Sequence, residues 1–596
     1  MASQFGGPSP APVDVMVAHF SNGALTPRTR SWLLAAGSCL CLAEIWIGGL
    51  YYSGYQVLAG RYGWFPNEMA FLLYYVLFGL PAIALLTAAL VPTAGERLLG
   101  GFDQAADLLP RETLAAVLCA SALSFFLITL VRYGILKDVA ISDDEHAYAF
   151  MGQLFATGRI YVPSLPSELR SFLDNQFIIN NGKMYGMYFP GHPAALALGE
   201  PLHLMRWIPT VSATLTVPLA FGVARRLFGL RPALLTMLLL LVSPYFLFPS
   251  ATLLAHSTAS VLLMTFLYAA LRLRETPESL LWWVVAGLAI SWATLTRPFS
   301  APFFAAPWLI SLAVDLWRRR SGRAWTGATI FCLIGAAAFG LLLAYQYALS
   351  GSPFISGYQT FDSITRWGLI GKALEATPPL PSVHELGFTL ARINFWLFGW
   401  PVSVVLLLFF QRNAGGKRLF ASVALVFLVY AAISAATIYP VGPVHYSELA
   451  VSLVMLSASG LDRLVGIART VPWHGAPRAA VTIPVATILC AMVTFLPVYG
   501  GSLRASADLV RASDELLAAQ GVARALVFVQ TLPTFYVSPY SWAYYRRNNH
   551  PDLTDPILYV NYASPERNKE FARLFPDRPV FSMGMKDGKF TMLPGP

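Results

Sequence analysis

Three consecutive carboxylates, followed by a histidine and a tyrosine, occupy residues 143–148, directly after an apolar stretch. The acidic residues are Asp143, Asp144 and Glu145. A carboxylate that is partly removed from water binds a proton more tightly and can act as a general base. We predict that Asp144 is the base of a transfer reaction, with Asp143 and Glu145 as further catalytic candidates. Such a reaction also needs cationic or hydrogen-bonding groups for a negatively charged leaving group.

The same carboxylates also have structural interpretations. Asp144 would be a favoured N-cap if a helix began here, and Asp143 is the alternative cap. For Glu145, solvation or pairing with Lys183 and a role in orienting substrate are equally open. The acidic cluster is also a candidate for a divalent metal. No distant set of carboxylates completes such a site, and we expect no cofactor.

Candidates for the remaining substrate contacts are spread along the chain. Arg297 lies in a very short polar connection between two apolar stretches. His256 lies near the end of an apolar stretch, where a functional role and a hydrogen-bonded structural role are equally open. Five more candidates for binding donor phosphate or substrate are Lys183, Tyr148, His445, Tyr446 and Glu448.

The elements that position these residues are predicted to be membrane-spanning helices. The chain has 596 residues, of which 56% are hydrophobic and 12% charged, and an average soluble protein is about 25% charged. Apolar stretches recur between residues 32 and 498, and about 20 such residues span a bilayer as a helix. The sequence therefore predicts an all-α polytopic membrane protein with about 13 spans. The five cysteines all lie in apolar stretches, which favours packing roles over disulfides or metal ligands.

The distribution of basic residues predicts the orientation. With a cytoplasmic N-terminus, six alternate connections are rich in arginine and lysine, which also accounts for the net charge of +10 without a nucleic-acid partner. The short connections on the opposite side hold only Arg61 and Arg297. This scarcity favours Arg297 as a phosphate ligand over an anchor at lipid headgroups. Residues 137–207, residues 350–391 and everything after residue 498 then lie on the exoplasmic side.

Three regions are expected along the chain. Residues 1–30 predict a disordered cytoplasmic tail, residues 31–500 a transmembrane module, and residues 501–596 a small exoplasmic α/β domain. Residues 144–157 predict an amphipathic helix lying on the membrane surface. Asn181-Gly182 predicts a β-hairpin with a two-residue turn.

Four motifs resemble those of GT-C glycosyltransferases, most closely the bacterial relatives of protein O-mannosyltransferases and of the lipid A aminoarabinose transferase. The resemblance covers roughly residues 141–464. Two features depart from it: three helices precede the first motif where one is common, and the loops on the acceptor side are unfamiliar. The motifs are Asp144-Glu145-x-x-Tyr148, Gly182-Lys183-x-Tyr185 followed by Tyr188-Phe189-Pro190-Gly191-His192-Pro193, Thr296-Arg297-Pro298, and Gly442-Pro443-Val444-His445-Tyr446-x-Glu448, where His445 replaces a more usual arginine.

The resemblance implies an inverting glycosyltransferase with a polyprenyl-phosphate monosaccharide as donor, and family members of this type need no metal. The acceptor would be an envelope glycan, lipid or protein. We expect the chain in the inner membrane of a bacterium, with the site and the C-terminus facing the periplasm. The alternatives are a transporter or flippase for a lipid-linked sugar, and a non-catalytic assembly factor for envelope polysaccharide.

Overall fold

The computed structural model describes residues 26–43, 75–175, 177–319, 321–365, 383–399, 402–432, 442–530, 549–586 and 589–593. Most of the predicted N-terminal tail lies outside these residues, as do parts of the predicted spans 32–52 and 69–91. Residues 27–43 are helical, so the last four residues of the predicted tail belong to a helix instead. Parts of the predicted second loop and of the C-terminal domain, residues 366–382 and 531–548, also lie outside the described residues.

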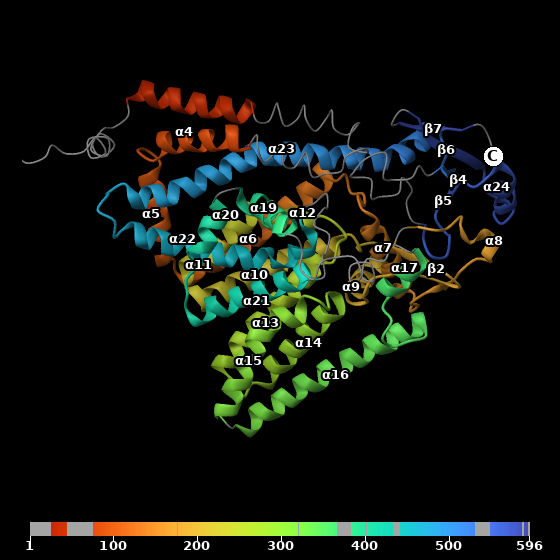
Figure 1. Cartoon of the computed structure of the whole chain (residues 1–596), viewed down its shortest axis with the longest axis horizontal. Helices are drawn as coiled ribbons and strands as arrows, with labels where there is room; N and C mark the ends of the chain where they lie inside the picture. The colour runs from red at the N-terminus through yellow and green to blue at the C-terminus, as the bar shows by residue number, and fades with distance from the viewer. Residues whose placement is uncertain are drawn as a thin grey trace, which may run out of the picture.

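Apolar helices form the main body of the protein (Figure 1). Six described helices are long and apolar enough to cross a membrane, or up to eight if each of two bent pairs is one span. The chain is therefore a mostly helical integral membrane protein, whereas the count of about 13 spans stays a prediction. The helices are α4 (Leu80–Leu90), α5 (Gly95–Gln104), α6 (Pro110–Leu130), α10 (Trp207–Phe228), α11 (Leu230–Leu241), α12 (Pro244–Ser250), α13 (His256–Glu275), α14 (Leu280–Thr296), α15 (Ala301–Arg319), α16 (Gly322–Ser350), α17 (Gly357–Thr365), α19 (Val383–Phe398), α20 (Val402–Leu408), α21 (Ala414–Ala432), α22 (Ala450–Ala468) and α23 (Ala476–Ala519).

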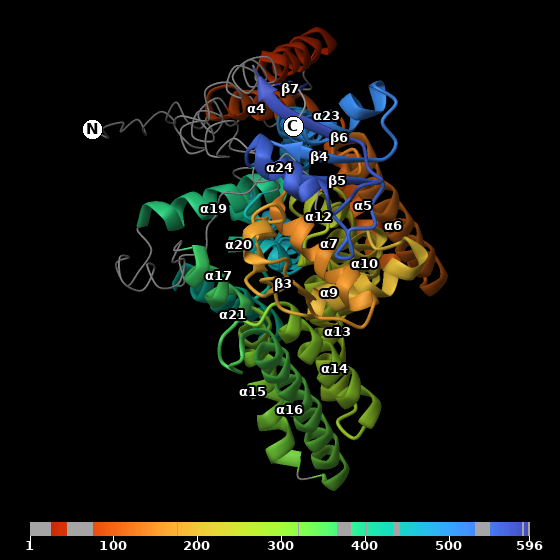
Figure 2. The same ribbon diagram turned by 90° about the vertical axis from the view of Figure 1, so that its right-hand side faces the viewer.

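The two ends of this helical body differ in their side chains. At one end, basic residues that close or open helices form ion pairs: Arg226 with Glu275 at 3.2 Å, and Arg231 with Asp462 at 3.0 Å. The opposite ends of α13 and α14 meet α9, which lies in the same loop as Asp144. Figure 2 shows α14, α15 and α16 projecting away from the C-terminal strands. The candidate residues therefore lie at the end opposite the basic ion pairs.

Asp144 lies in the first turn of helix α7 (Asp143–Ala156), close to the predicted start at residue 144. The N-cap position is Ser142, so the prediction that Asp143 or Asp144 caps the helix is wrong. The predicted apolar stripe is buried, but every other side chain of α7 is also at least partly covered. The helix is therefore enclosed by its neighbours instead of presenting one polar face. These neighbours are β3 (Lys183–Gly186), α9 (Gly191–Gly199) and η4 (Glu200–Leu202). The same loop also contains β1 (Val162–Pro163), α8 (Ser167–Arg170) and β2 (Ile178–Asn180).

The predicted hairpin is confirmed, but its turn differs from the prediction. Strands β2 and β3 pair with Asn180 opposite Met184, so three residues separate the last pair instead of two. Gly182 lies at the centre of this turn with φ +89°, a conformation that glycine adopts at little cost. Strand β1 adds to the other side of β3, giving the order β1-β3-β2.

The C-terminal region forms a four-stranded sheet with the order β5-β4-β6-β7. Its strands lie within a few residues of the apolar runs 525–529, 557–560, 580–583 and 590–593, which predict β-strands in the sequence, and α24 (Pro565–Ala572) completes the α/β unit. Helix α23 runs through residue 500 without a break, so the predicted domain boundary falls inside a helix of 44 residues that leads towards the sheet (Figure 1). The strands are β4 (Ala525–Val529), β5 (Ile557–Asn561), β6 (Val580–Lys586) and β7 (Lys589–Met592).

The sheet packs directly against the loop that follows α7. Phe172, which is fully buried, contacts Phe528 and Phe571 with ring centroids 5.9 and 4.4 Å apart. The backbone N–H of Asn561 donates to the carbonyl of Phe172 at 2.9 Å. The sheet and the first loop therefore share one apolar core.

Candidate functional site

Asp144 is held by a tyrosine that comes from the other side of the first loop. The Tyr188 hydroxyl donates a hydrogen bond to Asp144 Oδ1. Asp144 is half-buried, whereas Tyr188 is 4% exposed. Tyr188 follows β3 by two residues, so the hairpin determines where this hydroxyl lies. A donor fixed in this way orients the carboxylate.

Aromatic rings surround this carboxylate. The Tyr148 ring stacks on Tyr188 with centroids 4.2 Å apart, and Tyr358 meets Tyr188 edge-on at 5.6 Å. Tyr358 lies in the first turn of α17, which begins at Gly357 against the backbone of Met187. Offset or edge-on aromatic pairs of this kind are stabilising beyond the area they bury. The second predicted loop thus contributes one wall of the site.

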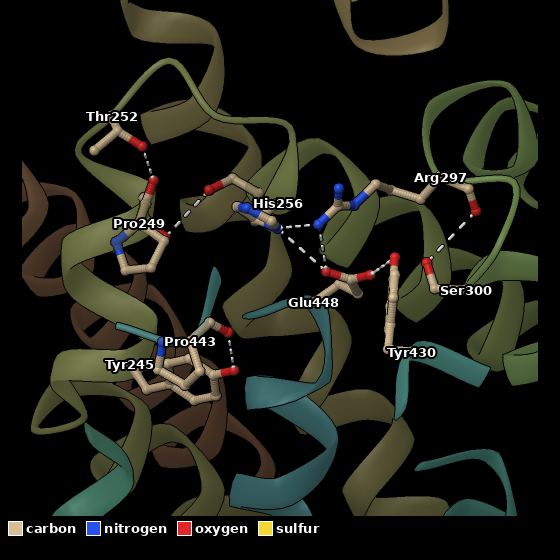
Figure 3. A network of polar contacts seen from close by, with 11 residues as sticks. Tyr245, Pro249, Thr252, His256, Arg297, Ser300, Tyr430, Pro443 and Glu448 are labelled. Carbon is tan, nitrogen blue, oxygen red and sulfur yellow. Dashed lines mark hydrogen bonds and ion pairs between the residues drawn. The ribbon is translucent and has the colours of Figure 1, made fainter. Parts of the chain in front are cut away.

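Arg297 lies in a second polar cluster, shown in Figure 3. Its Nη2 group lies 3.3 Å from Glu448 Oε2 and 3.0 Å from His256 Nδ1. Glu448 is fully buried, and its other oxygen, Oε1, accepts a hydrogen bond from the Tyr430 hydroxyl at 3.1 Å. Arg297 Nε is also buried, with no hydrogen-bond acceptor among the described residues. A guanidinium anchored through one Nη group keeps its other donors for an anionic ligand.

Helix termini bring these residues together. Arg297 directly follows α14, and His256 is the first residue of α13. Glu448 lies in η5 (Val444–Leu449), the turn that leads into α22. The three predicted candidates are 41 to 192 residues apart in the sequence, yet they form one contact network.

The Asp144 and Arg297 clusters lie close together, because Gly191, three residues after Tyr188, packs against the backbone of Thr296 next to Arg297. Burial raises the pKa of the Tyr358 hydroxyl, the positive charge of Arg297 opposes that shift, and the negative charge of Asp144 adds to it. Burial also raises the pKa of Tyr148, with the same opposite effects of Arg297 and Asp144. Both charges therefore lie within electrostatic range of the same two tyrosines.

Glu145 has a different surrounding from Asp144. Its Oε2 accepts a hydrogen bond from the backbone N–H of Leu253 at 2.8 Å, and its Oε1 accepts one from the N–H of Ile141 at 3.0 Å. Burial raises the pKa of Glu145, and the two N–H donors oppose that shift. These contacts replace the pairing with Lys183 considered above. Lys183 instead donates to the carbonyl of Ala348 at 2.6 Å and lies over the ring of Tyr161.

The other predicted candidates lie nearby with different degrees of burial. Asp143 is fully buried in the first turn of α7, one residue before Asp144. Tyr446 is 2% exposed and packs against Phe427 and Tyr430, which indicates a core position. His445 is half-buried, and its ring centroid lies 6.1 Å from that of Tyr430.

Sequence reasoning did not single out three residues of the site. Tyr188 belongs to one of the four motifs, but the sequence assigned it no role. It is 44 residues from Asp144 in the sequence, so local patterns could not predict their contact. Tyr430 lies within an apolar helix, where a tyrosine gives no signal of a buried carboxylate partner. His192 was also in a motif, and its contacts with Thr258 and Leu253 depend on the packing of α9 against α13.

The described residues contain no cluster of three or more histidine, cysteine, aspartate or glutamate side chains with the spacing of a metal site. The predicted lack of a cofactor stays a prediction.

Residues 194–344 match the family model described as dolichyl-phosphate-mannose-protein mannosyltransferase. No curated protein sequence matches the chain. Among solved structures, ArnT from Cupriavidus metallidurans bound to undecaprenyl phosphate is similar, with 15% identity over 80% of this chain and 94% of that chain and a TM-score of 0.47. The archaeal oligosaccharyltransferase AglB from Archaeoglobus fulgidus, in complex with an inhibitory peptide and a dolichol-phosphate, has 11% identity over 79% and 69% of the two chains and a TM-score of 0.38.

The matched residues include Arg297 and His256 and end before α17, whereas Asp144 precedes them. The family that the motifs resemble and the family of the matching model are the same. Residues 194–344 are thus similar to the dolichyl-phosphate-mannose-protein mannosyltransferases.

Proposed function

We propose that the chain is an inverting glycosyltransferase that moves one monosaccharide from a polyprenyl phosphate to a hydroxyl of an envelope acceptor. Asp144 acts as the general base and Arg297 as the cation that receives the leaving phosphate. The observation that carries this proposal is that the segment from Tyr188, which donates to Asp144, to Gly191, which packs against Thr296 next to Arg297, joins the two clusters.

The proposed reaction is a single displacement. Asp144 takes the proton of the acceptor hydroxyl while its oxygen forms a bond to the anomeric carbon. The bond between that carbon and the phosphate oxygen breaks, and the polyprenyl phosphate leaves with the electron pair. Attack from the side opposite the leaving group inverts the anomeric centre. Only one carboxylate needs to act as a base, which fits the structural contacts that occupy both oxygens of Glu145.

The position of Arg297 supports its role at the leaving group. Its side chain is 13% exposed, and Glu448 and His256 fix one Nη group. The buried Nε has no acceptor among the described residues. Charge-assisted hydrogen bonds from a preorganised guanidinium are strong ligands for phosphate oxygens. The undecaprenyl phosphate in the similar ArnT structure makes that lipid a suitable probe.

The first test is Asp144→Asn in a strain that lacks the chromosomal gene. The amide has nearly the same shape but cannot accept the acceptor's proton at neutral pH. We expect envelope glycans, lipids and proteins from this strain, measured by mass spectrometry, to lack the modification that the wild-type chain restores. Loss of at least 100-fold is expected, the usual range for a general base.

Two controls make this result specific. Purified Asp144→Asn should still bind undecaprenyl phosphate, because Arg297 and its contacts with Glu448 and His256 are unchanged. Arg297→Lys should weaken that binding about tenfold, since lysine keeps the charge beside Glu448 but loses the planar fork. Full modification by Asp144→Asn at wild-type protein levels would contradict the catalytic role and leave the transporter and assembly-factor alternatives.

A further inference from the structure

The connection between α12 and α13, residues 251–255, lies between the two clusters of the candidate site. α13 begins directly after it at His256, which contacts Arg297 and Glu448. Leu253, in the middle of this connection, is 3% exposed and its backbone is held from two sides. Its N–H donates to Glu145, and its carbonyl lies 2.8 Å from His192 Nε2. Because both contacts are buried, water does not compete for them.

Glu145 joins this connection to the Asp144 side. Its carboxylate contacts three groups, the N–H of Leu253 at 2.8 Å, the N–H of Ile141 at 3.0 Å and the Ser142 hydroxyl at 3.4 Å. Ile141 and Ser142 directly precede α7, in whose first turn Asp144 lies. One buried carboxylate therefore bridges the start of α7 and the start of α13.

His192 joins the same connection from α9. Its Nδ1 lies 3.0 Å from the Thr258 hydroxyl, and its ring meets Tyr148 edge-on at 4.9 Å. Burial lowers the pKa of His192 to about 3, so the ring is neutral at pH 7 and carries one N–H. The Leu253 carbonyl can only accept a hydrogen bond, so that proton lies on Nε2 and Thr258 donates to Nδ1.

These contacts connect the Asp144 cluster with the Arg297 cluster. From Leu253, one path runs through Glu145 to the backbone that carries Asp144. A second path runs through His192 and the stacked rings of Tyr148 and Tyr188 to the Asp144 carboxylate. From the other end of the connection, His256 leads to Arg297.

We propose that Glu145, His192 and the Leu253 backbone form a strut that sets the separation between Asp144 and Arg297, with Glu145 and His192 as positioning residues. The proposal rests on the proposed function, because this separation matters for turnover only if base and cation act in one step. Displacement of a reacting group by about 1 Å can lower a rate about 100-fold. Loss of the strut should therefore reduce turnover while leaving each half of the site able to bind its own ligand.

The contact itself is tested by hydrogen–deuterium exchange of the full-length protein in nanodiscs. In Glu145→Ala, the Leu253 amide loses its acceptor, and we expect its exchange to become at least tenfold faster. Val465→Ala is the control, because Val465 is a buried core residue of α22 beside α5, at the opposite end of the bundle. It should lower the melting temperature without a selective increase at residues 251–255. Unchanged exchange of this amide in Glu145→Ala would overturn the proposal.

The functional consequence is tested by separating turnover from ligand binding. Glu145→Ala should lower envelope modification at least tenfold at matched protein levels, whereas its affinity for undecaprenyl phosphate should change less than threefold. His192→Gln should keep most of the modification, since its terminal amide can donate to the Leu253 carbonyl as Nε2 does. His192→Leu should lose it. Equal loss in His192→Gln and His192→Leu would overturn the role of this hydrogen bond.

The design also separates failure of the strut from failure of the proposed function. If Asp144→Asn keeps full modification, the assignment of the base is wrong, while the exchange of the Leu253 amide still tests the strut. If Asp144→Asn loses modification but Glu145→Ala keeps it, the base assignment stands and the strut is overturned.

Discussion

At the scale of single residues, the neighbouring carboxylates of α7 show how much local surroundings decide chemistry. Glu145 has both oxygens on backbone N–H groups, whereas Asp144 is half-buried and receives a tyrosine hydroxyl. Glu145 therefore holds the start of α7 against Leu253, whereas Asp144 contacts the hydroxyl of Tyr188. The sequence placed both in one acidic cluster but carried no information about which backbone groups would meet them.

Tyr188→Phe tests how the Tyr188 hydroxyl affects the activity of Asp144 and its pH dependence. Removing it should leave the stacking with Tyr148 in place and reduce turnover about tenfold, since a hydrogen bond to a charged group contributes about 1.5–3 kcal/mol. The carboxylate loses a donor that favours its charged form, so the acid limb of the pH–rate profile should move to higher pH. Turnover measured from pH 4 to 8 checks both effects.

The matched control for this variant is Tyr347→Phe. Tyr347 lies on α16 and is 62% exposed, so removal of its hydroxyl should leave turnover and its pH dependence unchanged. A Tyr188→Phe enzyme with the wild-type pH profile would show that the hydroxyl does not act on the catalytic carboxylate.

At the scale of elements, local patterns in the sequence predicted much of what the structure contains. The four C-terminal strands were predicted from short apolar runs, and α7 from its apolar spacing. The predicted start of α7 and the predicted length of the hairpin turn each differ from the structure by one residue. Helix and strand ends depend on neighbours that local patterns do not include. The meeting of His256, Arg297 and Glu448 could not be predicted, since it follows from how three helices pack.

Gly191→Ala tests the close approach of α9 to α14. A Cβ atom at Gly191 would lie 2.6 Å from the backbone N of Thr296, and the Trp292 indole N–H already donates to the Gly191 carbonyl at 2.7 Å. The two helices would have to separate next to Arg297. We expect turnover to fall at least tenfold and the affinity for undecaprenyl phosphate to weaken, measured on the purified protein.

Gly134→Ala provides the comparison for this glycine. There a Cβ atom would meet only the Leu130 side chain, at 3.7 Å, an ordinary contact distance. Activity should therefore be retained. Equal activity of the Gly191 and Gly134 variants would mean that Arg297 tolerates movement of α9.

At the scale of the whole molecule, an apolar contact and an ion pair both join the C-terminal sheet to the first loop. Phe172 is fully buried between Phe528 and Phe571, whereas the side chains of Arg159 and Asp552 are 37% and 38% exposed. Phe172→Ala should cost about 3–5 kcal/mol, as for other buried phenylalanines. Arg159→Ala should cost about 1 kcal/mol or less, because water screens an exposed ion pair.

Thermal unfolding and limited trypsin digestion after Arg524, at the exposed start of β4, would measure this difference. We expect faster cleavage in Phe172→Ala and near-normal cleavage in Arg159→Ala. Greater destabilisation by Arg159→Ala would show that charge, and not apolar burial, attaches the sheet.

The overall arrangement was predicted only in part. Spacing of apolar stretches and the distribution of basic residues predicted a helical membrane protein with its candidate residues at one end. A single boundary at residue 500 was predicted because the composition becomes more polar there. The backbone nevertheless continues as α23, since a helix needs no change in geometry where its surroundings change from apolar to polar.

The continuity of α23 couples the protein to the thickness of its bilayer. Its 44 residues make a helix about 66 Å long, roughly twice the 30 Å of a hydrocarbon core. The apolar part, Ala476–Val493, must match the acyl chains, and the remainder carries the sheet that packs on the first loop. A change in chain length tilts such a helix and moves its outer end most. Lipid composition would therefore change the position of the sheet and of the first loop, which contains Asp144.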